Sequence, residues 1–424
     1  MYEGGAFMKQ YPLLNNKTSR FAFALFLTAM LFLSRDTLFS SCLMGFAQSQ
    51  ILMFGLIVFL GAAFLWVNRK EFLLILKDRR IPMLAFAVLI IVLPMVIKRD
   101  WQLMYFSILL CVLTAIFLTY FTSSREVAKY YVVILVILGI YSVVASYGLK
   151  YLARAEMINP GKFLNSSRLT FYNFWFTYVP PSYHWYRNYG IFREPGVYQF
   201  FALLAIYLNN YNVDWDRAWK LWSCNAVLVV TLLSTFAIGG YAELALLTVF
   251  LFFDKKWYRS KSGRIAAAVV VTFAVSLISA FFYFFHHPSF AKTIFYEFYD
   301  MFLRLFTGSD SMRDRVDAIL VNLQFFVRNP LVGDAIAEVL HGTNHNTSST
   351  LLLYAIFGVV GGTLNVAAWI ALLWKRNRNL LGNLILLVIM FMSFNTQNLV
   401  ANVFFWLFPM MVLVERGMPL LKKE

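Results

Sequence analysis

Charged residues are scarce in this sequence. Asp, Glu, Lys and Arg make up 14% of the 424 residues, whereas hydrophobic residues make up 60%. In soluble globular domains about a quarter of the residues are charged. The composition therefore excludes an ordinary soluble domain, and it is typical of a protein that crosses a lipid bilayer many times.

Metal-binding and disulfide patterns are also missing from the sequence. The three cysteines, Cys42, Cys111 and Cys224, lie in or beside apolar runs and form no C-x-x-C pair and no Cys/His pattern. The loops that we assign below to the outer face contain no D-x-D-like motif. We therefore expect neither a metal ion nor a cofactor.

Long apolar runs are abundant. They predict an all-α polytopic membrane protein in which the whole chain, 1–424, forms a single integral membrane domain. The expected membrane helices cover residues 21–42, 50–68, 82–97, 102–121, 130–149, 197–210, 218–236, 239–254, 265–285, 349–374, 379–394 and 398–414.

Basic residues are distributed unevenly between the loops. The net charge is +16, and most of the 37 Lys and Arg fall in alternate loops. Because positively charged loops stay in the cytoplasm, this alternation predicts about twelve spans with both termini cytoplasmic. Topology accounts for these cations, so we expect no nucleic acid partner.

Two loops on the predicted outer face are long, residues 150–196 and 286–346. Long loops in compact proteins are usually functional. The first is rich in cations on the side of the membrane where cations are normally few. It contains Lys150, Arg154, Lys162, Arg168, Arg187 and Arg193 against Glu156 and Glu194.

The first long loop ends in the corner F-R-E-P-G-V-Y-Q, residues 192–199. Pro195 suits the first turn of a helix because it lacks an N–H, and Gly196 lets another group approach closely. Glu194 complements the helix N-terminus. Arg193 is then expected at the outer rim of the helix. The plainer interpretation is an interfacial arginine beside a capped helix.

The second long loop contains apolar residues at helical spacing from 316 to 326, which predicts an amphipathic helix lying on the membrane. Arg315 stands at the start of this helix, and Arg313 precedes it by half a turn. Pro330 ends the helix and opens the turn P-L-V-G.

His345 and Asn346 come directly before the predicted helix 349–374, which Thr347 or Ser348 can cap. The helix dipole favours a neutral His345, which is then able to accept a proton. A structural interfacial histidine is the plainer interpretation, and His341 is the nearest competitor for the role of base.

These motifs together resemble the O-antigen polymerase/ligase (Wzy_C-type) superfamily. The resemblance rests on the offset from Arg315 to Pro330, the His345–Asn346 pair and the trailing G-V-V-G that begins at Gly358. The R-E-P-G corner resembles the polymerase branch of that superfamily. Such a resemblance implies a GT-C-like fold in a bacterial inner membrane, with the active site facing the periplasm.

The resemblance also implies a glycosyltransferase whose donor is a glycan on undecaprenyl pyrophosphate. Its partners would be a lipid-linked donor and acceptor, the bilayer, and a chain-length regulator protein. The leaving pyrophosphate needs fixed cations, and the attacking hydroxyl needs a base. We assign His345 as the catalytic base, Arg193 and Arg315 as pyrophosphate-binding residues, Arg187 and Arg313 as second-line pyrophosphate binders, and Glu194, Gly196 and Asn346 as supporting residues.

Two other functions fit part of the pattern. An O-antigen ligase would transfer the glycan to the lipid A core, and it differs from a polymerase only in its acceptor. A non-enzymatic flippase or transporter would place ionisable residues near the middle of the membrane spans. Here they gather at the outer rim, which favours chemistry on a lipid head group, and the R-E-P-G corner favours the polymerase.

The predicted topology can be tested by cysteine labelling in intact cells. Cysteines introduced at Arg168 and Arg313 should react with a membrane-impermeant reagent added from outside, because both positions lie in the predicted periplasmic loops. Protection of both positions until the cells are lysed would contradict this topology.

Overall fold

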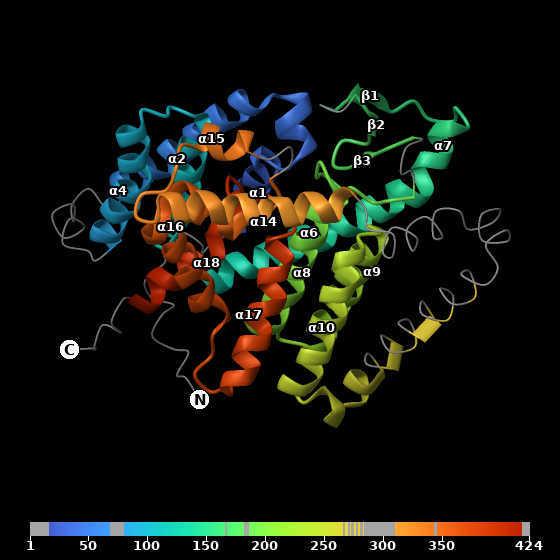
Figure 1. Ribbon diagram of the computed structural model, residues 1–424. Coiled ribbons are helices and arrows are strands. Elements are labelled where there is room, and N and C mark those ends of the chain that lie inside the picture. The colour runs from blue at the N-terminus through green and yellow to red at the C-terminus, as the bar shows by residue number, and fades with distance from the viewer. Residues whose placement is uncertain are drawn as a thin grey trace.

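The computed structural model of the protein describes residues 17–67, 80–165, 168–181, 186–265, 310–342 and 346–417, with a few helical residues between 268 and 283. The described residues are mostly helical, with 74% of them in helices and few in strands. The helices pack side by side, and one of them lies across the others (Figure 1).

Helices occupy most of the predicted ranges that the structure describes, although the predicted range 265–285 lies largely outside the described residues. The α-helices are α1 (Lys17–Leu33), α2 (Phe46–Val67), α4 (Arg80–Lys98), α5 (Leu103–Leu118), α6 (Ser124–Val144), α7 (Lys150–Arg154), α8 (Pro195–Tyr211), α9 (Ala218–Ser234), α10 (Ile238–Asp254), α14 (Asp310–Arg328), α15 (Ile336–His341), α16 (Ser349–Leu373), α17 (Leu380–Phe394) and α18 (Val403–Gly417). Short π-helical turns, η3 (Phe39–Leu43) and η5 (Ala145–Leu149), and a 3₁₀ turn, η6 (Trp257–Arg259), join some of them.

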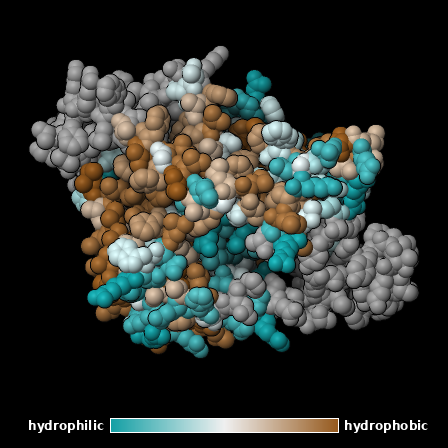
Figure 2. Space-filling view, turned by 90° about the horizontal axis from the view of Figure 1, so that it is seen from above, coloured by the Kyte–Doolittle hydropathy of each residue, from teal (hydrophilic) through white to brown (hydrophobic). Residues whose placement is uncertain are grey.

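Within the described ranges, three helices are long and apolar enough to cross a membrane: Arg80–Lys98, Ser124–Arg154 and Ser349–Leu373. Shorter apolar helices surround them. Large hydrophobic side chains of α2 and α4 face outward, with Phe59 71% and Leu89 56% exposed. Seen from above in Figure 2, hydrophobic residues cover a broad area on the left, the side on which α2 and α4 lie. An exposed apolar surface of this kind fits contact with lipid.

The predicted first helix, 21–42, is not continuous. α1 ends at Leu33, and the π-helical turn η3 follows after a short break that contains Arg35 and Asp36. In this break the Thr37 hydroxyl donates to the carbonyl oxygens of Phe32 and Ser34, at 2.6 and 2.9 Å. Local hydrogen bonds of this type compete with the helical ones and end the helix.

The first long loop contains a small sheet that the all-α prediction did not include. Its strands are β1 (Gly161–Leu164), β2 (Thr170–Asn173) and β3 (Tyr178–Val179), paired antiparallel in that order. Phe163 pairs with Phe171 across β1 and β2, and their rings stack at 5.8 Å. Aromatic pairs stabilise short strands, so this loop is an ordered platform on the helices.

Helix α14 includes the predicted amphipathic segment 316–326 and ends at Arg328, two residues before Pro330. It lies across the ends of the upright helices at the front of Figure 1, against α16. Asn322 is fully buried on its inner side, whereas Val327 on its outer side is 69% exposed.

The P-L-V-G turn docks into a break in α16. Gly358 interrupts the helix with φ 63° and ψ −162°. The freed groups are satisfied by the turn, because the Val359 N–H donates to the Pro330 carbonyl oxygen at 2.7 Å. The Lys98 ammonium donates to three carbonyl oxygens at this junction, those of Val332, Asp334 and Ile356, at 2.7 to 2.9 Å. Backbone groups inside a membrane protein need such partners.

Replacing Gly358 by alanine should therefore destabilise the protein. A Cβ at this position would collide with the Leu331 backbone, and its φ is one that residues with side chains rarely adopt. We expect a loss of about 2–5 kcal/mol in the free energy of unfolding, seen as a lower Tm in detergent. Gly55→Ala is the matched control, because nothing lies within 4 Å of its added Cβ. Equal Tm values for the two variants would contradict the docked break.

Candidate functional site

The R-E-P-G corner is joined to the break after α1. The Arg193 N–H donates to the Asp36 carbonyl oxygen, and the Leu38 N–H donates to the Ile191 carbonyl oxygen, both at 2.9 Å. Thr37 and Phe192 form an isolated antiparallel bridge between these contacts. Two segments far apart in the sequence are therefore hydrogen-bonded to each other, and α8 begins immediately afterwards at Pro195.

The guanidinium of Arg193 is held on one edge. Its Nε lies 3.5 Å from Asp36 Oδ1 and 3.9 Å from Glu194 Oε1. Burial opposes the charge of Arg193, but Asp36 and Glu194 outweigh burial and raise its pKa. The two terminal nitrogens of Arg193 make no hydrogen bond or ion pair with any residue that the structure describes. That edge has the fork geometry that binds phosphate oxygens.

Asp36 is the residue that orients Arg193. Its carboxylate is fully buried and accepts a hydrogen bond from Asn402 Nδ2 at 3.0 Å. Asn402 also caps the start of α18, because its Oδ1 accepts from the Phe404 N–H at 3.0 Å. Asp36 therefore connects the end of α1, the corner before α8 and the start of α18.

Arg187 has a partner in the protein. Its Nε donates to the carbonyl oxygen of Thr235, the C-cap residue of α9, at 3.1 Å. A cation at a helix C-terminus is stabilised by the helix dipole. The next residue, Asn188, is buried and donates to the hydroxyls of Ser142 and Ser234, both at 2.9 Å. These contacts fix the chain ahead of the corner.

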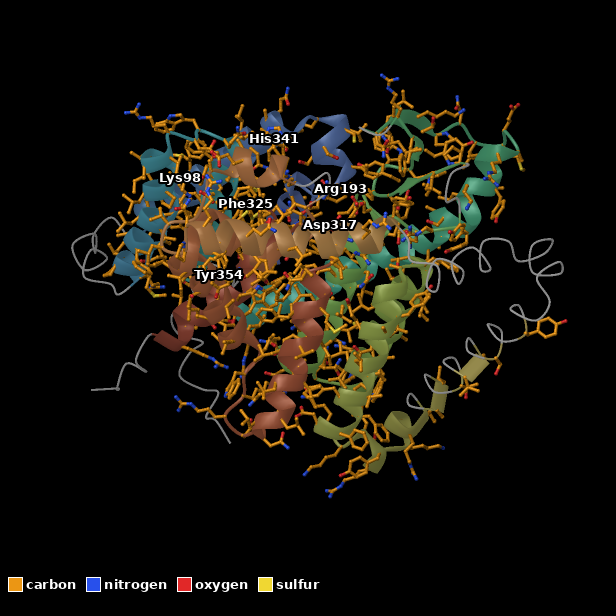
Figure 3. All side chains as sticks on the ribbon, viewed as in Figure 1. Lys98, Arg193, Asp317, Phe325, His341 and Tyr354 are labelled. Carbon is orange, nitrogen blue, oxygen red and sulfur yellow. The ribbon has the colours of Figure 1, made fainter. Side chains whose placement is uncertain are left out.

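Arg315 enters the site from α14. Its Nε is buried without a hydrogen-bond partner among the described residues. Burial lowers the pKa of Arg315, Glu194 and Glu243 favour its charge, and Arg187 opposes it. Glu194 therefore lies within electrostatic reach of both Arg193 and Arg315. In the view of Figure 3, Arg193 appears over the N-terminal half of α14, where Asp317 is labelled.

Arg313 lies on the same helix but is exposed. The assignment of Arg313 as a pyrophosphate binder remains a prediction.

A buried carboxylate lies within electrostatic reach of Arg315. Glu243 on α10 is 1% exposed and accepts a hydrogen bond from Gln199 Nε2 of α8 at 2.7 Å. Gly240 and Gly196 allow this packing, since an added Cβ would collide with the side chains of Gln199 and Gln397 respectively. The expected close approach at Gly196 is therefore made by the Gln397 side chain.

Asn346 ties the start of α16 to α14. Its amide exchanges two hydrogen bonds with the amide of Asn322, at 2.7 and 3.0 Å. His345, the expected base, lies outside the described residues. His341 ends α15 and is exposed.

Ser348 is the N-cap residue of α16, but its side chain does not accept the capping hydrogen bond. Asn395 does so instead, through a contact of 3.0 Å from the Thr350 N–H.

The fold and these contacts define a class of protein: a mostly helical protein with helices that can cross a membrane and a polar cluster, Arg193, Glu194, Glu243 and Arg315, at one end of α8 and α10. No protein-family model matches the chain, and no curated protein is significantly similar to it.

Three polar residues of the site were not predicted from the sequence. Asp36, Asn402 and Glu243 are buried polar residues inside or beside apolar runs. A polar residue in such a run is costly unless it is paired, so its presence alone is a signal of function or of a specific contact. The partner, however, cannot be read from the position.

The role of Asp36 can be tested by Asp36→Asn. An amide in place of the carboxylate presents N–H groups to Arg193 and leaves buried donors unpaired, so we expect a loss of about 1–3 kcal/mol in the free energy of unfolding. The control is Asp214→Asn, which removes an exposed ion pair with Arg125 and should change stability by less than about 0.5 kcal/mol. Equal melting curves for the two variants would contradict the assigned role.

Proposed function

We propose that the protein is a glycosyltransferase that polymerises oligosaccharide repeat units linked to undecaprenyl pyrophosphate. One observation carries the proposal. Arg193 and Arg315 come from separate segments, and Glu194 favours the charge of both. The terminal nitrogens of Arg193 and the buried Nε of Arg315 have no hydrogen-bond partner among the described residues. Buried polar groups in proteins are normally paired, so unpartnered guanidinium N–H groups on two arginines that share Glu194 favour an anionic ligand.

A pyrophosphate is an anion suited to this arrangement. Its oxygens can accept two parallel hydrogen bonds from each guanidinium, and charge-assisted bonds of this kind contribute about 1.5–3 kcal/mol each. Asp36 holds Arg193 by its Nε and leaves the two terminal nitrogens free for the ligand. The leaving group is thereby stabilised by side chains already in place, which is how preorganised charges lower a reaction barrier.

The reaction that we propose forms a bond between an acceptor hydroxyl oxygen and the anomeric carbon of the donor glycan. The bond between that carbon and the pyrophosphate oxygen breaks, and undecaprenyl pyrophosphate leaves with the electron pair. His345 takes the hydroxyl proton, a contribution of about 10²–10⁴ in rate. Its chain neighbour Asn346 is anchored to Asn322 on α14, the helix that carries Arg315.

Two substitutions test the proposal in purified protein supplied with lipid-linked repeat units. Arg315→Lys keeps the charge but loses the fork, so polymer synthesis should fall about tenfold or more. Arg328→Lys on the same helix is the control, because Arg328 is 60% exposed and pairs with Glu338. His345→Ala should abolish synthesis, whereas His341→Ala should retain most of it.

Polymer length is followed on gels, with EDTA present throughout. Full activity of His345→Ala, or a strict requirement for added Mg²⁺, would contradict the mechanism. A deletion strain separates the polymerase from the ligase. Loss of the polymerase leaves single repeat units on the lipid A core, whereas loss of the ligase leaves a bare core and long lipid-linked polymer.

A further inference from the structure

A second charged cluster lies at the opposite end of α8 and α10. α8 begins at Pro195, beside Arg193, and ends at Tyr211, and α10 ends at Asp254. Each helix has 17 residues, so the two ends are about 25 Å apart. The cluster is therefore separate from the Arg193–Arg315 site.

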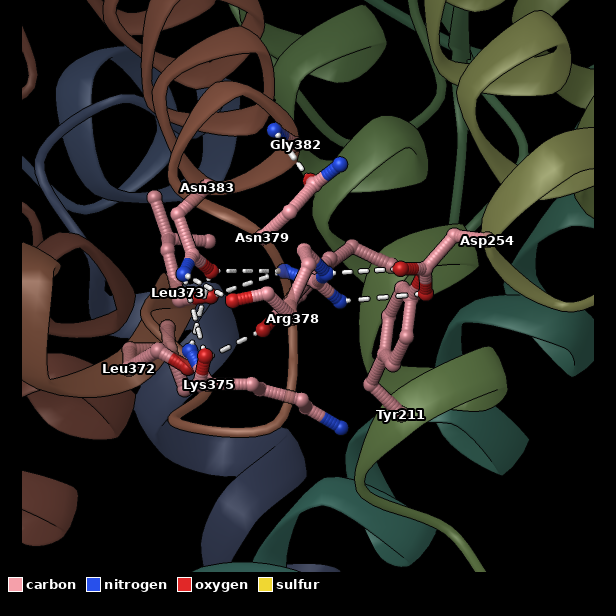
Figure 4. A network of polar contacts seen from close by, with 10 residues as sticks. Tyr211, Asp254, Leu372, Leu373, Lys375, Arg378, Asn379, Gly382 and Asn383 are labelled. Atoms are coloured by element: carbon pink, nitrogen blue, oxygen red, sulfur yellow. Dashed lines mark hydrogen bonds and ion pairs between the residues drawn. The ribbon is translucent and has the colours of Figure 1, made fainter.

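The centre of this second cluster is a buried ion pair. Arg378, whose side chain is 5% exposed, donates from Nε and Nη2 to the two oxygens of Asp254, at 2.7 and 3.2 Å. The Tyr211 hydroxyl also donates to Asp254, and Asn383 accepts from Arg378 Nη1 at 3.3 Å. Figure 4 shows these contacts joining α8, α10 and the loop between α16 and α17. The negative charge of Asp254 is thus paired with the guanidinium of Arg378.

Two lysines of the cluster remain without an anion. The ammonium groups of Lys255 and Lys375 lie 4.3 and 4.2 Å from the centre of the Tyr211 ring. Among the described residues, neither ammonium makes a hydrogen bond or an ion pair. Burial, together with the nearby charges of Lys255 and Arg378, lowers the pKa of Lys375 to about 8. The Asp214 carboxylate also favours the charge of Lys255, but Asp214 is paired with Arg125 at 3.1 Å. Four cations, Lys255, Lys375, Arg378 and Arg125, therefore share two carboxylates, which leaves a local excess of positive charge.

Several tryptophans indicate how deep this cluster lies relative to the membrane surface. Trp222 near the start of α9 packs against Trp257 just beyond α10, with ring centres 4.8 Å apart. Trp374 follows α16, and Trp219 is 60% exposed. Tryptophans gather where lipid head groups meet water, so the two lysines lie at head-group level.

We propose that Lys255 and Lys375 bind the phosphate of an anionic phospholipid in the adjacent leaflet. A phosphodiester offers an oxygen to each ammonium and neutralises the excess charge. Basic pockets between membrane helices are known to hold such head groups, and each lysine near a charged surface contributes to the attraction. The bound lipid would bridge α10 and the α16–α17 loop. This proposal is independent of the glycosyltransferase assignment.

The test compares two double variants of the full-length protein. Lys255→Gln/Lys375→Gln removes the proposed ligands and keeps the Arg378–Asp254 pair. Lys256→Gln/Arg376→Gln removes the same net charge from the two neighbouring positions, which are exposed, as is Lys255. Each protein is placed in nanodiscs of phosphatidylcholine with or without phosphatidylglycerol, and retained lipid is counted by native mass spectrometry while Tm is measured.

We expect phosphatidylglycerol to remain bound to the wild type and the Lys256/Arg376 variant and to raise their Tm. The Lys255/Lys375 variant should bind it about tenfold more weakly and lose most of the Tm increase. Equal lipid retention by the two double variants would overturn the site. A Tm increase produced equally by inorganic phosphate in phosphatidylcholine alone would overturn the assignment to a lipid.

Discussion

The buried carboxylate of Asp36 is the interaction on which the outer end of the molecule depends. Burying a carboxylate is expensive unless an opposite charge and hydrogen bonds compensate for the lost water. The charge of Asp36 is balanced by Arg193, whose Nε lies 3.5 Å from Oδ1 as an ion pair without a hydrogen bond, and Oδ2 accepts a hydrogen bond from Asn402. Because those partners lie just before α8 and α18, the position of two helix starts follows from one charge that must be paired.

The same constraint explains why the polar cluster is rigid. Arg193 is fixed by an ion pair and by its own backbone, and Arg187 and Asn188 are fixed at the C-terminal end of α9. Beyond the C-terminal end of α14, Lys98 joins the P-L-V-G turn to the break in α16 at Gly358. These contacts fix the path of the chain from α14 to α16. Arg315 is thereby presented by a helix that is anchored at Asn322 and just beyond its C-terminal end. A site for charged ligands benefits from this rigidity, because charges held in place need no reorganisation when the ligand binds.

The sequence predicted what depends on neighbouring residues. Apolar runs located the helices, Pro195 located the start of α8, and Pro330 the end of α14. It could not predict contacts between distant residues, such as Asp36 with Asn402, which are 366 positions apart. The capping of α16 by Asn395 depends on a tertiary partner that the local sequence does not show. The break at Arg35 and Asp36 follows from the local hydrogen bonds of Thr37, which the apolar pattern does not indicate. Among the candidate site residues, Arg193, Glu194 and Arg315 lie in one electrostatic cluster, whereas Arg187 pairs with a helix end.

The most direct test is an experimental structure of the protein with an undecaprenyl-pyrophosphate-linked repeat unit bound. We expect density for the pyrophosphate between the terminal nitrogens of Arg193 and the guanidinium of Arg315, with the first sugar directed toward residue 345. Asp36 should keep its contact with Arg193 Nε in that complex. A pyrophosphate bound elsewhere, with Arg315 in contact only with protein side chains, would contradict the proposed function.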